Sequence, residues 1–203
     1  VTFTPNTVAE LLPGATATVQ VSAKVPREQD SGLVDIGDIT VAADGVPSKT
    51  ITAFSTNAKS GLEVTDVTVN GRTENKLQPG EENEFEATVK NILGVEIEDI
   101  TVKVIVKDID EEDLDATSEE FDLNSGRNNE KGVTLLLPFN LDKETYTVEI
   151  EVTGTDTNGA DHLTRTTKQI DVERRTHQLV LNKVDLPSSL SCNLNPVLTV
   201  EIK

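Results

Sequence analysis

The stretch ITVKVIVKD, at residues 100–108, decides the fold of this chain. Its apolar side chains recur at every second position, and mostly Thr and Lys lie between them. A period of two is typical of a β-strand, because successive side chains point to opposite faces of the sheet. We therefore expect one buried face, formed by Ile100, Val102, Val104 and Val106, and one face in water.

The same period recurs along much of the chain. The stretches TATVQVSAKV (16–25), NEFEATVKN (83–91) and ETYTVEIEV (144–152) all alternate in this way. No window has the 3.6-residue period of a long amphipathic helix. Asn-Gly pairs at 70–71 and 158–159 suit tight turns with positive φ. The sequence therefore predicts an all-β protein.

Residues 61–174 are predicted to form a complete sandwich of seven strands. Seven short antiparallel strands in about 110 residues are typical of an immunoglobulin-like fold. Tyr146 follows the turn NLDKE at 140–144, and such folds often bond a tyrosine hydroxyl back to the preceding turn. The alternative is a tyrosine that only packs at the end of the sandwich. The expected strands lie near 62–69, 82–91, 96–107, 118–123, 132–138, 144–153 and 162–172.

The last residues repeat an earlier pattern. Residues 179–203 align without a gap with residues 62–86, an offset of 117. The alignment pairs Leu62 with Leu179 and Phe85 with Ile202, and it also pairs two prolines. We therefore predict that residues 175–203 contain the first two strands of a further sandwich.

The first residues fit the second half of a sandwich. Residues 11–26 align with residues 123–138 at an offset of 112, which pairs Gly14 with Gly126. A match of residues 1–25 to residues 67–91 also exists, so the register is not unique. Because about 60 residues cannot supply the core of a sandwich of about 100, we assign residues 1–60 to the C-terminal half of one.

The predicted fold is thus a tandem of immunoglobulin-like β-sandwiches, one complete at 61–174 and one partial at each end, 1–60 and 175–203. Two explanations of the partial ends remain open. The missing halves lie in the same polypeptide, which we favour, or the tail of one subunit completes the half-sandwich of the next. The second explanation uses an exposed sheet edge as a template for added strands.

Charge excludes several partners. The net charge is −18, and it is concentrated in residues 61–174, with twenty-eight acids and eleven bases. Residues 1–60 carry six acids and four bases, and residues 175–203 carry two and three. Nucleic acid is not expected as a partner, because binding it requires a basic face. An anionic membrane surface is disfavoured likewise, and no run of about 18 apolar residues predicts membrane insertion.

An enzyme is not expected. His162 and His177 have no Ser or Cys nucleophile motif to pair with, so we interpret each as a plain surface residue. Aromatic residues make up 3% of the chain, too few for the ring-walled cleft of a glycosidase. The single cysteine, Cys192, is interpreted as a small apolar residue, with a disulfide to a cysteine outside this chain as the alternative.

An acidic segment is the one candidate metal site. Nine acids and no base lie from Asp108 to Asp122. Such crowding favours screening by a cation, and calcium takes six to eight oxygen ligands in flexible geometry. The alternative is a solvated acidic loop, and the spacing is not that of an EF-hand. Calcium is the one cofactor that the sequence suggests, and its predicted ligands are Asp108, Asp110, Glu112, Asp113 and Asp115.

Two stretches resemble known families. LQPGEENEFEATVKNILGVEIEDITVKVIV (77–106), followed by YTVEIEVTGTDTNG (146–159), resembles the cell-adhesion-related domain of bacterial and archaeal surface proteins. FTPNTVAELLPGATATVQVSAKVP (3–26) is similar to the closing half of the Ig-like domain associated with carbohydrate-binding modules (NPCBM) and S-layer proteins. The resemblance implies an exported chain at the cell surface, in a surface layer, stalk, filament or adhesin. These families supply no catalytic residues to transfer.

The expected function is therefore that of a structural repeat in an exported prokaryotic cell-surface protein. It would span distance and hold its neighbours, other copies or other surface-protein domains, by sandwich contacts. The alternative is an adhesin-type module that recognises a receptor or glycan through its loops.

Overall fold

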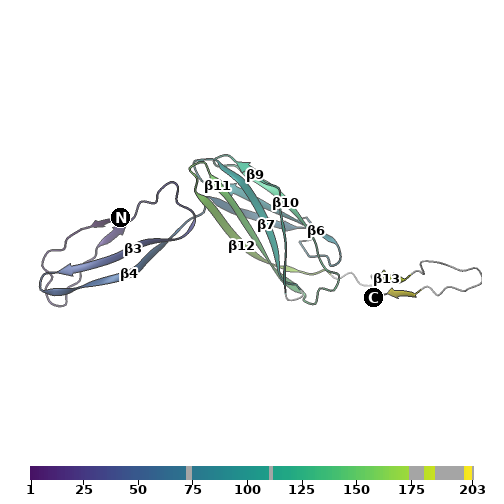
Figure 1. Cartoon of the computed structure of the whole chain (residues 1–203), viewed down its shortest axis with the longest axis horizontal. Helices are drawn as coiled ribbons and strands as arrows, with labels where there is room; N and C mark the ends of the chain where they lie inside the picture. Colours follow the sequence, from purple (N-terminus) through teal and green to yellow (C-terminus); the bar gives the residue numbers. More distant parts are fainter. Residues whose placement is uncertain (72–74, 110–111, 174–180, 186–198, 203) are drawn as a thin grey trace, which may run out of the picture. The chain divides into compact units, whose positions relative to one another are not determined.

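The computed structural model describes residues 1–71, 75–109, 112–173, 181–185 and 199–202. These residues form fourteen strands and no helix, which confirms the all-β prediction (Figure 1). The described part of the chain accordingly contains no helix long and apolar enough to cross a membrane. The chain divides into two compact units, Val1–Val172 and Glu173–Lys203.

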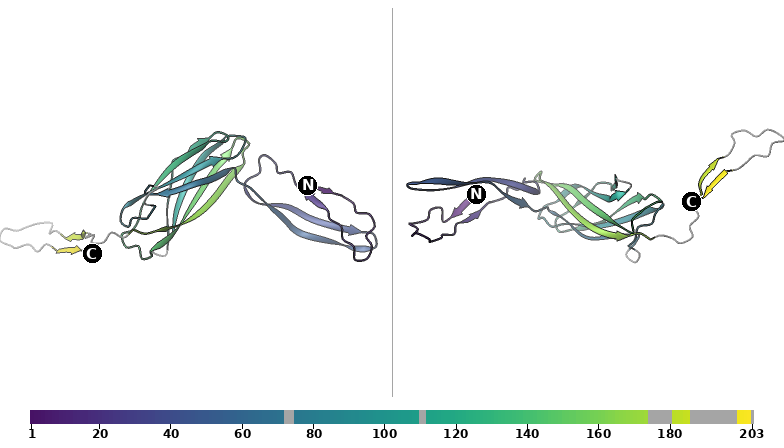
Figure 2. Two further views of the ribbon diagram at one scale, coloured as in Figure 1. Left: turned by 180° about the vertical axis from the view of Figure 1, so that it is seen from behind. Right: turned by 90° about the horizontal axis from the view of Figure 1, so that it is seen from below.

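Two sheets of the first unit enclose one core. One has the order β10-β6-β5, and the other has the order β12-β11-β7-β8, with β9 also paired to β7. The first sheet contains β5 (Leu62–Val69), β6 (Glu82–Asn91) and β10 (Asn128–Leu136). The second contains β7 (Ile97–Ile109), β8 (Glu112–Thr117), β9 (Phe121–Leu123), β11 (Thr145–Asp156) and β12 (Asp161–Asp171). We call residues 62–172 the sandwich; Figure 2 shows its teal and green strands gathered into one body.

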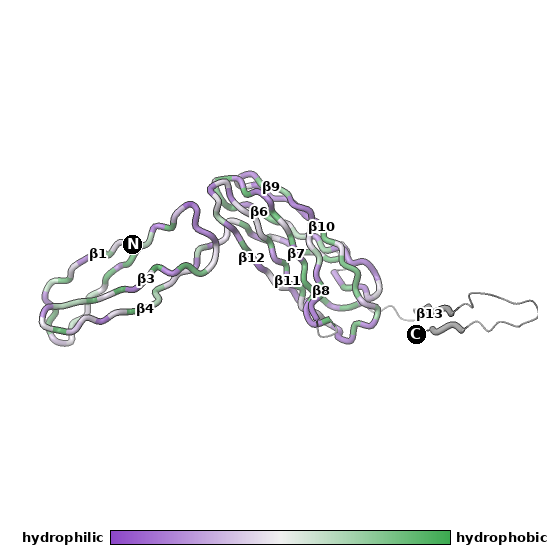
Figure 3. Tube along the Cα trace, viewed as in Figure 1, coloured by the Kyte–Doolittle hydropathy of each residue, from purple (hydrophilic) through white to green (hydrophobic). Residues whose placement is uncertain are grey.

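The core is made by the alternation that the sequence shows. Ile100, Val102, Val104 and Val106 are all 0% exposed, as predicted, and they join the apolar side chains of β5, β6, β10 and β11 in one cluster. Green and purple segments alternate along these strands in Figure 3. Burial of each such side chain contributes about 1.5–3 kcal/mol, so this cluster is the main source of stability.

Much of the described acidic segment is strand rather than loop, which corrects one expectation. Where one strand was expected at 118–123, the structure has β8 and then β9. After Ile109 the chain returns antiparallel to β7, with Leu114 and Ala116 packed against the core. Asp113 and Asp115 therefore lie on the outer face of β8 and alternate with Leu114 and Ala116, which have a face to bury.

Residues 1–60 form two separate antiparallel pairs. β1 (Thr2–Thr4) pairs with β2 (Gln20–Ser22), and β3 (Gly32–Ala43) pairs with β4 (Val46–Ala58). None of the buried apolar residues of the described chain lies in this segment. The assignment of residues 1–60 as half a sandwich stays a prediction.

The second unit contains two described strands. β13 (Leu181–Asp185) pairs antiparallel with β14 (Thr199–Ile202), within the segment where two strands were expected. That they open a further sandwich stays a prediction. His177 and Cys192 lie outside the described residues, so the expectations for them are untested.

Candidate functional site

Two of the predicted calcium ligands lie on β8 and face lysines of β7. The Nζ of Lys107 donates to Oδ2 of Asp113 at 2.9 Å, and the Nζ of Lys103 lies 3.1 Å from Oδ2 of Asp115. The bond from Lys107, with a second from the backbone amide of Asp108, holds the pKa of Asp113 below its ordinary value. The same pair raises the pKa of Lys107. Lysines therefore balance part of the charge that suggested a cation.

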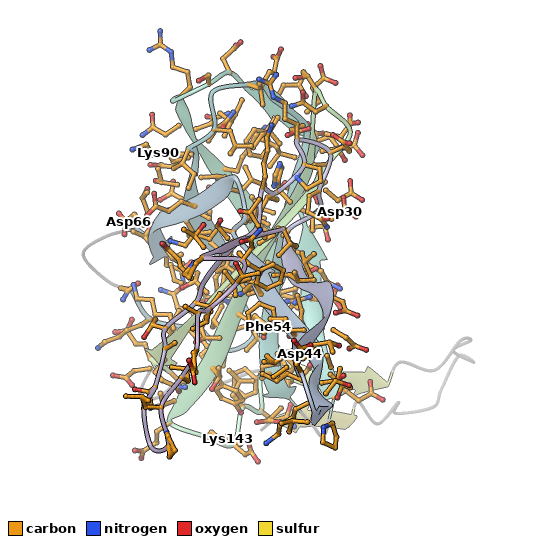
Figure 4. All side chains as sticks on the ribbon, turned by 90° about the vertical axis from the view of Figure 1, so that its left-hand side faces the viewer. Asp30, Asp44, Phe54, Asp66, Lys90 and Lys143 are labelled. Carbon is orange, nitrogen blue, oxygen red and sulfur yellow. The ribbon has the colours of Figure 1, made fainter. Side chains whose placement is uncertain are left out.

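The other predicted ligands do not converge in the described structure. Oδ2 of Asp108 lies 3.3 Å from Nζ of Lys143, a residue labelled in Figure 4, which places the 139–144 turn beside the end of β7. Glu112 is exposed at the start of β8, and Asp110 lies outside the described residues. Among the residues that the structure describes, no three His, Cys, Asp or Glu side chains are placed to hold a metal ion. The calcium site stays a prediction.

Calcium binding has a definite signature. A site formed by the acidic segment should give heat in titration calorimetry and raise the melting temperature. At a free calcium concentration of 100 times the Kd, the unfolding free energy should rise by about 2.7 kcal/mol. The double variant Asp108→Asn, Glu112→Gln should abolish both effects, and Glu119→Gln in the same stretch should keep them. If no heat is released at millimolar calcium and chelator does not change the melting temperature, the calcium prediction is wrong. The acids of β8 are then balanced by the lysines of β7 alone.

Tyr146 fixes the turn before β11. Its hydroxyl accepts hydrogen bonds from the backbone amides of Asp142 and Lys143 at 3.2 and 3.3 Å, and it donates to Oδ1 of Asp142 at 2.8 Å. The residue is only 2% exposed. The predicted bond from the hydroxyl back to the preceding turn is thus confirmed. The donated bond also lowers the pKa of Asp142.

Tyr146→Phe should cost about 1 kcal/mol of unfolding free energy, because the ring stays buried while the hydroxyl bonds are lost. The pKa of Asp142, read by NMR, should rise toward its ordinary value at the same time. Thr147→Val removes a hydroxyl from the next residue and serves as the control, with an unchanged Asp142 pKa. An equal pKa change in both variants would contradict this role.

The start of β12 binds the residues that precede β3. The amide of Ser31 donates to the carbonyl of Asp161 at 2.7 Å, and the amide of Asp161 donates to Oδ1 of Asp30 at 2.8 Å. The amide of Leu163 donates to Oγ of Ser31 at 2.7 Å. Because β12 is the last strand of its sheet, these groups would otherwise be unpaired. Asp30 (labelled in Figure 4) and Ser31 therefore pair backbone groups at the open edge of β12, mainly through their side chains.

The residues that follow β4 bind at the same place. The amide of Gly61 donates to Nδ1 of His162 at 3.1 Å, and its carbonyl accepts from the amide of Ile92 at 2.9 Å. A Cβ on Gly61 would collide with the side chain of Leu93, so a larger residue would require Leu93 or this backbone to shift. Both ends of the β3–β4 hairpin are thus bonded to β12. We call Asp30, Ser31, Gly61 and residues 156–163 the junction.

His162 is buried, which corrects its interpretation as a surface residue. It is 5% exposed, and because Nδ1 accepts the Gly61 amide, the ring proton belongs on Nε2. Nε2 lies 3.4 Å from Oδ2 of Asp156 and makes no hydrogen bond within the described chain, so we treat this contact as electrostatic. No apolar alternation marks His162 as buried, because the next three inward positions of β12 are Thr164, Thr166 and Lys168, and only the fourth, Ile170, is apolar.

Asp156 organises the turn between β11 and β12. Burial opposes its ionisation, but its Oδ1 accepts the amides of Asn158 and Ala160 at 2.7 and 3.1 Å. These bonds outweigh burial and hold the pKa of Asp156 below its ordinary value. The ionised carboxylate therefore holds the turn and faces the His162 ring. The polar side chains of the junction bond to backbone amides and contact one another. They thereby attach both ends of the β3–β4 hairpin to β12.

A groove borders the junction. Its volume is about 570 Å³, and it is lined by Gly32, residues 57–60, 62–64 and 163–166, and Ile92. None of these lining residues is aromatic. A sugar-stacking surface is therefore missing from this groove.

Comparison with known proteins gives no family. No family model matches the chain, and no curated protein matches it. Among solved structures it is similar to the C-terminal domain of wzt, with 14% identity over 66% of this chain and 84% of that one, and a TM-score of 0.46. The sporulation control protein Spo0M from Bacillus subtilis has 18% identity over 62% of this chain and 59% of that one, with a TM-score of 0.35. The ApaA protein from Bordetella pertussis has 18% identity over 58% of this chain and 98% of that one, with a TM-score of 0.40. Likeness at this level carries no inference about function.

Proposed function

We propose that this chain is a structural repeat segment of an exported prokaryotic cell-surface protein, built from tandem immunoglobulin-like sandwiches. It spans distance in a surface layer, stalk or filament and assembles through sandwich contacts. Its partners are other copies of itself or neighbouring surface-protein domains, and its place is outside the cell.

The junction is the observation that supports this proposal most directly. A flexible tether needs no hydrogen bonds between the segments it joins, and domains joined only by a linker move independently by default. Here residues on both sides of the β3–β4 hairpin bond to β12, through Ser31 and Gly61. Such attachment suits a chain that transmits position from one repeat to the next.

The composition of the surface supports the same proposal over a glycan-binding module. The groove beside the junction has no aromatic lining, and aromatic rings are the usual platform for sugars. The charge of residues 61–174 is −17, from eleven bases and twenty-eight acids, so copies repel one another along this sandwich. Contacts between copies are therefore expected at the nearly neutral end segments.

Location on intact cells tests the proposal. An antibody raised against residues 1–203 should label the surface of unbroken source cells, and external protease should remove the epitope. Electron microscopy of the isolated material should show a regular end-to-end assembly. Protection of the epitope until the cells are lysed would contradict an exported location. Saturable binding of a receptor or glycan by a monodisperse monomer would favour the adhesin alternative.

A further inference from the structure

The chain has two Asn-Gly pairs, at 70–71 and 158–159, and the fold holds their asparagines differently. Asparagine before glycine is chemically labile, because the glycine nitrogen can attack the side-chain carbonyl carbon, Cγ, and glycine has no Cβ to block the approach. The new C–N bond closes a succinimide ring, and the amide group leaves as ammonia with the proton of the glycine nitrogen. Water then opens the ring to aspartate or isoaspartate. The bonds that hold the carboxamide and the glycine nitrogen therefore decide whether a pair reacts in the folded chain.

The carboxamide of Asn70 is held by three hydrogen bonds. Its Nδ2 donates to the carbonyl of Lys76 and to Oδ1 of Asn83, both at 2.8 Å, and its Oδ1 accepts from the amide of Glu84 at 3.0 Å. Asn83 is 0% exposed, so this network is anchored inside the sandwich. Rotation of the carboxamide toward the nitrogen of Gly71 would break all three bonds, and the fold therefore protects Asn70.

The carboxamide of Asn158 is held more weakly. Within the described chain its one hydrogen bond runs from Nδ2 to Oδ2 of Asp156, at 3.3 Å, and the residue is exposed. The amide of Gly159 donates to the carbonyl of Asp156 at 2.8 Å, and this turn bond must open before the nitrogen can attack. Ring closure at Asn158 thus breaks one short hydrogen bond and one long one, against three short ones at Asn70.

We propose that Asn158 is a site of spontaneous deamidation, and that its conversion loosens the junction. The reaction needs only water, so it is independent of the proposed function. The product has a carboxylate oxygen where Nδ2 now donates to Asp156, so two negative charges meet there. Isoaspartate also adds a methylene group to the backbone between the amides of Asn158 and Ala160, which both bond to Asp156. Because Asp156 faces His162, which accepts the Gly61 amide, the attachment of β4 to β12 weakens as well.

Mass spectrometry of the full chain tests the site. The folded chain is incubated in mildly alkaline buffer and digested with trypsin, which gives peptides spanning residues 60–72 and 144–165 with one asparagine each. Replacement of NH2 by OH should appear about ten times faster at Asn158 than at Asn70. In chain unfolded by urea the two rates should be similar, because only the fold separates the two pairs. Asn158→Gln should abolish the change in peptide 144–165, because glutamine would have to close a less favourable six-membered ring.

A stable mimic of the aspartate product tests the consequence. Asn158→Asp should accelerate hydrogen exchange at the amide of Gly61 about threefold, because one more charge faces Asp156. The pKa of Asp156, read by NMR, should rise toward its ordinary value in the same variant. Asn140→Asp adds the same charge at an exposed position outside the junction and should change neither measurement.

Three results would overturn the proposed site: equal rates at the two asparagines of the folded chain, a faster reaction at Asn70, or an unreacted Asn158 in folded chain after the unfolded chain has converted. An unchanged exchange rate of the Gly61 amide in Asn158→Asp would overturn the loosening of the junction.

Discussion

Phe85→Ala should lower the unfolding free energy by about 3–5 kcal/mol, the largest effect expected of a single substitution here. Phe85 is 1% exposed at the middle of the three-stranded sheet, where it pairs with Val69 of β5 and Val133 of β10. Truncation removes apolar burial and leaves a cavity that the two sheets cannot close. Urea unfolding followed by circular dichroism measures the loss.

Phe3→Ala is the matched control for the same side chain. Phe3 lies on β1 and is 40% exposed, so its truncation should change the unfolding free energy by less than about 0.5 kcal/mol. A loss comparable to that of Phe85→Ala would mean that residues 1–60 have a core of their own. It would also contradict the assignment of these residues to an incomplete domain.

Strands of the sandwich could be predicted because burial imposes a period of two on the sequence. β5 and β6 begin and end where the alternation of residues 62–69 and 82–91 begins and ends. β8 was missed, although Leu114 and Ala116 alternate with acids, because the density of charge suggested a loop. Charge density alone does not distinguish a loop from an edge strand whose outer face is in water.

Buried polar residues could not be predicted in the same way. Asn83 is 0% exposed, and its amide donates to the carbonyls of Gln78 and Glu81 while its Oδ1 accepts from Gln78 and Asn70. In the sequence it follows a Pro-Gly turn, where an asparagine is ordinarily solvated. Its role depends on Asn70, which follows the end of β5, and such a partner is fixed only by the fold.

The candidate site was outside the reach of the sequence for the same reason. The predicted ligands were chosen by their spacing, but the register of β8 against β7 brings Lys107 to Asp113 and Lys103 to Asp115. The junction joins residues about 130 positions apart, Ser31 and Asp161, through backbone groups that carry no sequence signature. Of these residues, only Gly61 has a residue type that its position requires, because a side chain there would collide with Leu93.

Asp156→Ala should cost about 2–3 kcal/mol and loosen the junction. The substitution leaves the amides of Asn158 and Ala160 without their acceptor and removes the carboxylate that faces His162, all in a buried place. Because His162 accepts the Gly61 amide, hydrogen exchange at Gly61 should accelerate along with the loss of stability. Asp44→Asn, an exposed change in the β3–β4 turn, should leave both measurements unchanged.

The stability that Asp156 supplies should also depend on pH, with a sign that follows from its lowered pKa. The folded-state pKa lies below the ordinary value of 3.8, so the unfolded chain binds the proton more readily. Its contribution is then fully present above about pH 5 and is lost as the pH falls through 3.8 toward the folded-state value. Asp156→Asn keeps an acceptor oxygen but cannot ionise, so the gap in unfolding free energy between this variant and the unaltered chain should narrow on acidification. A gap that stays constant from pH 6 to pH 3 would show that the charge of Asp156 does not hold the turn, and that the shape of its side chain alone does.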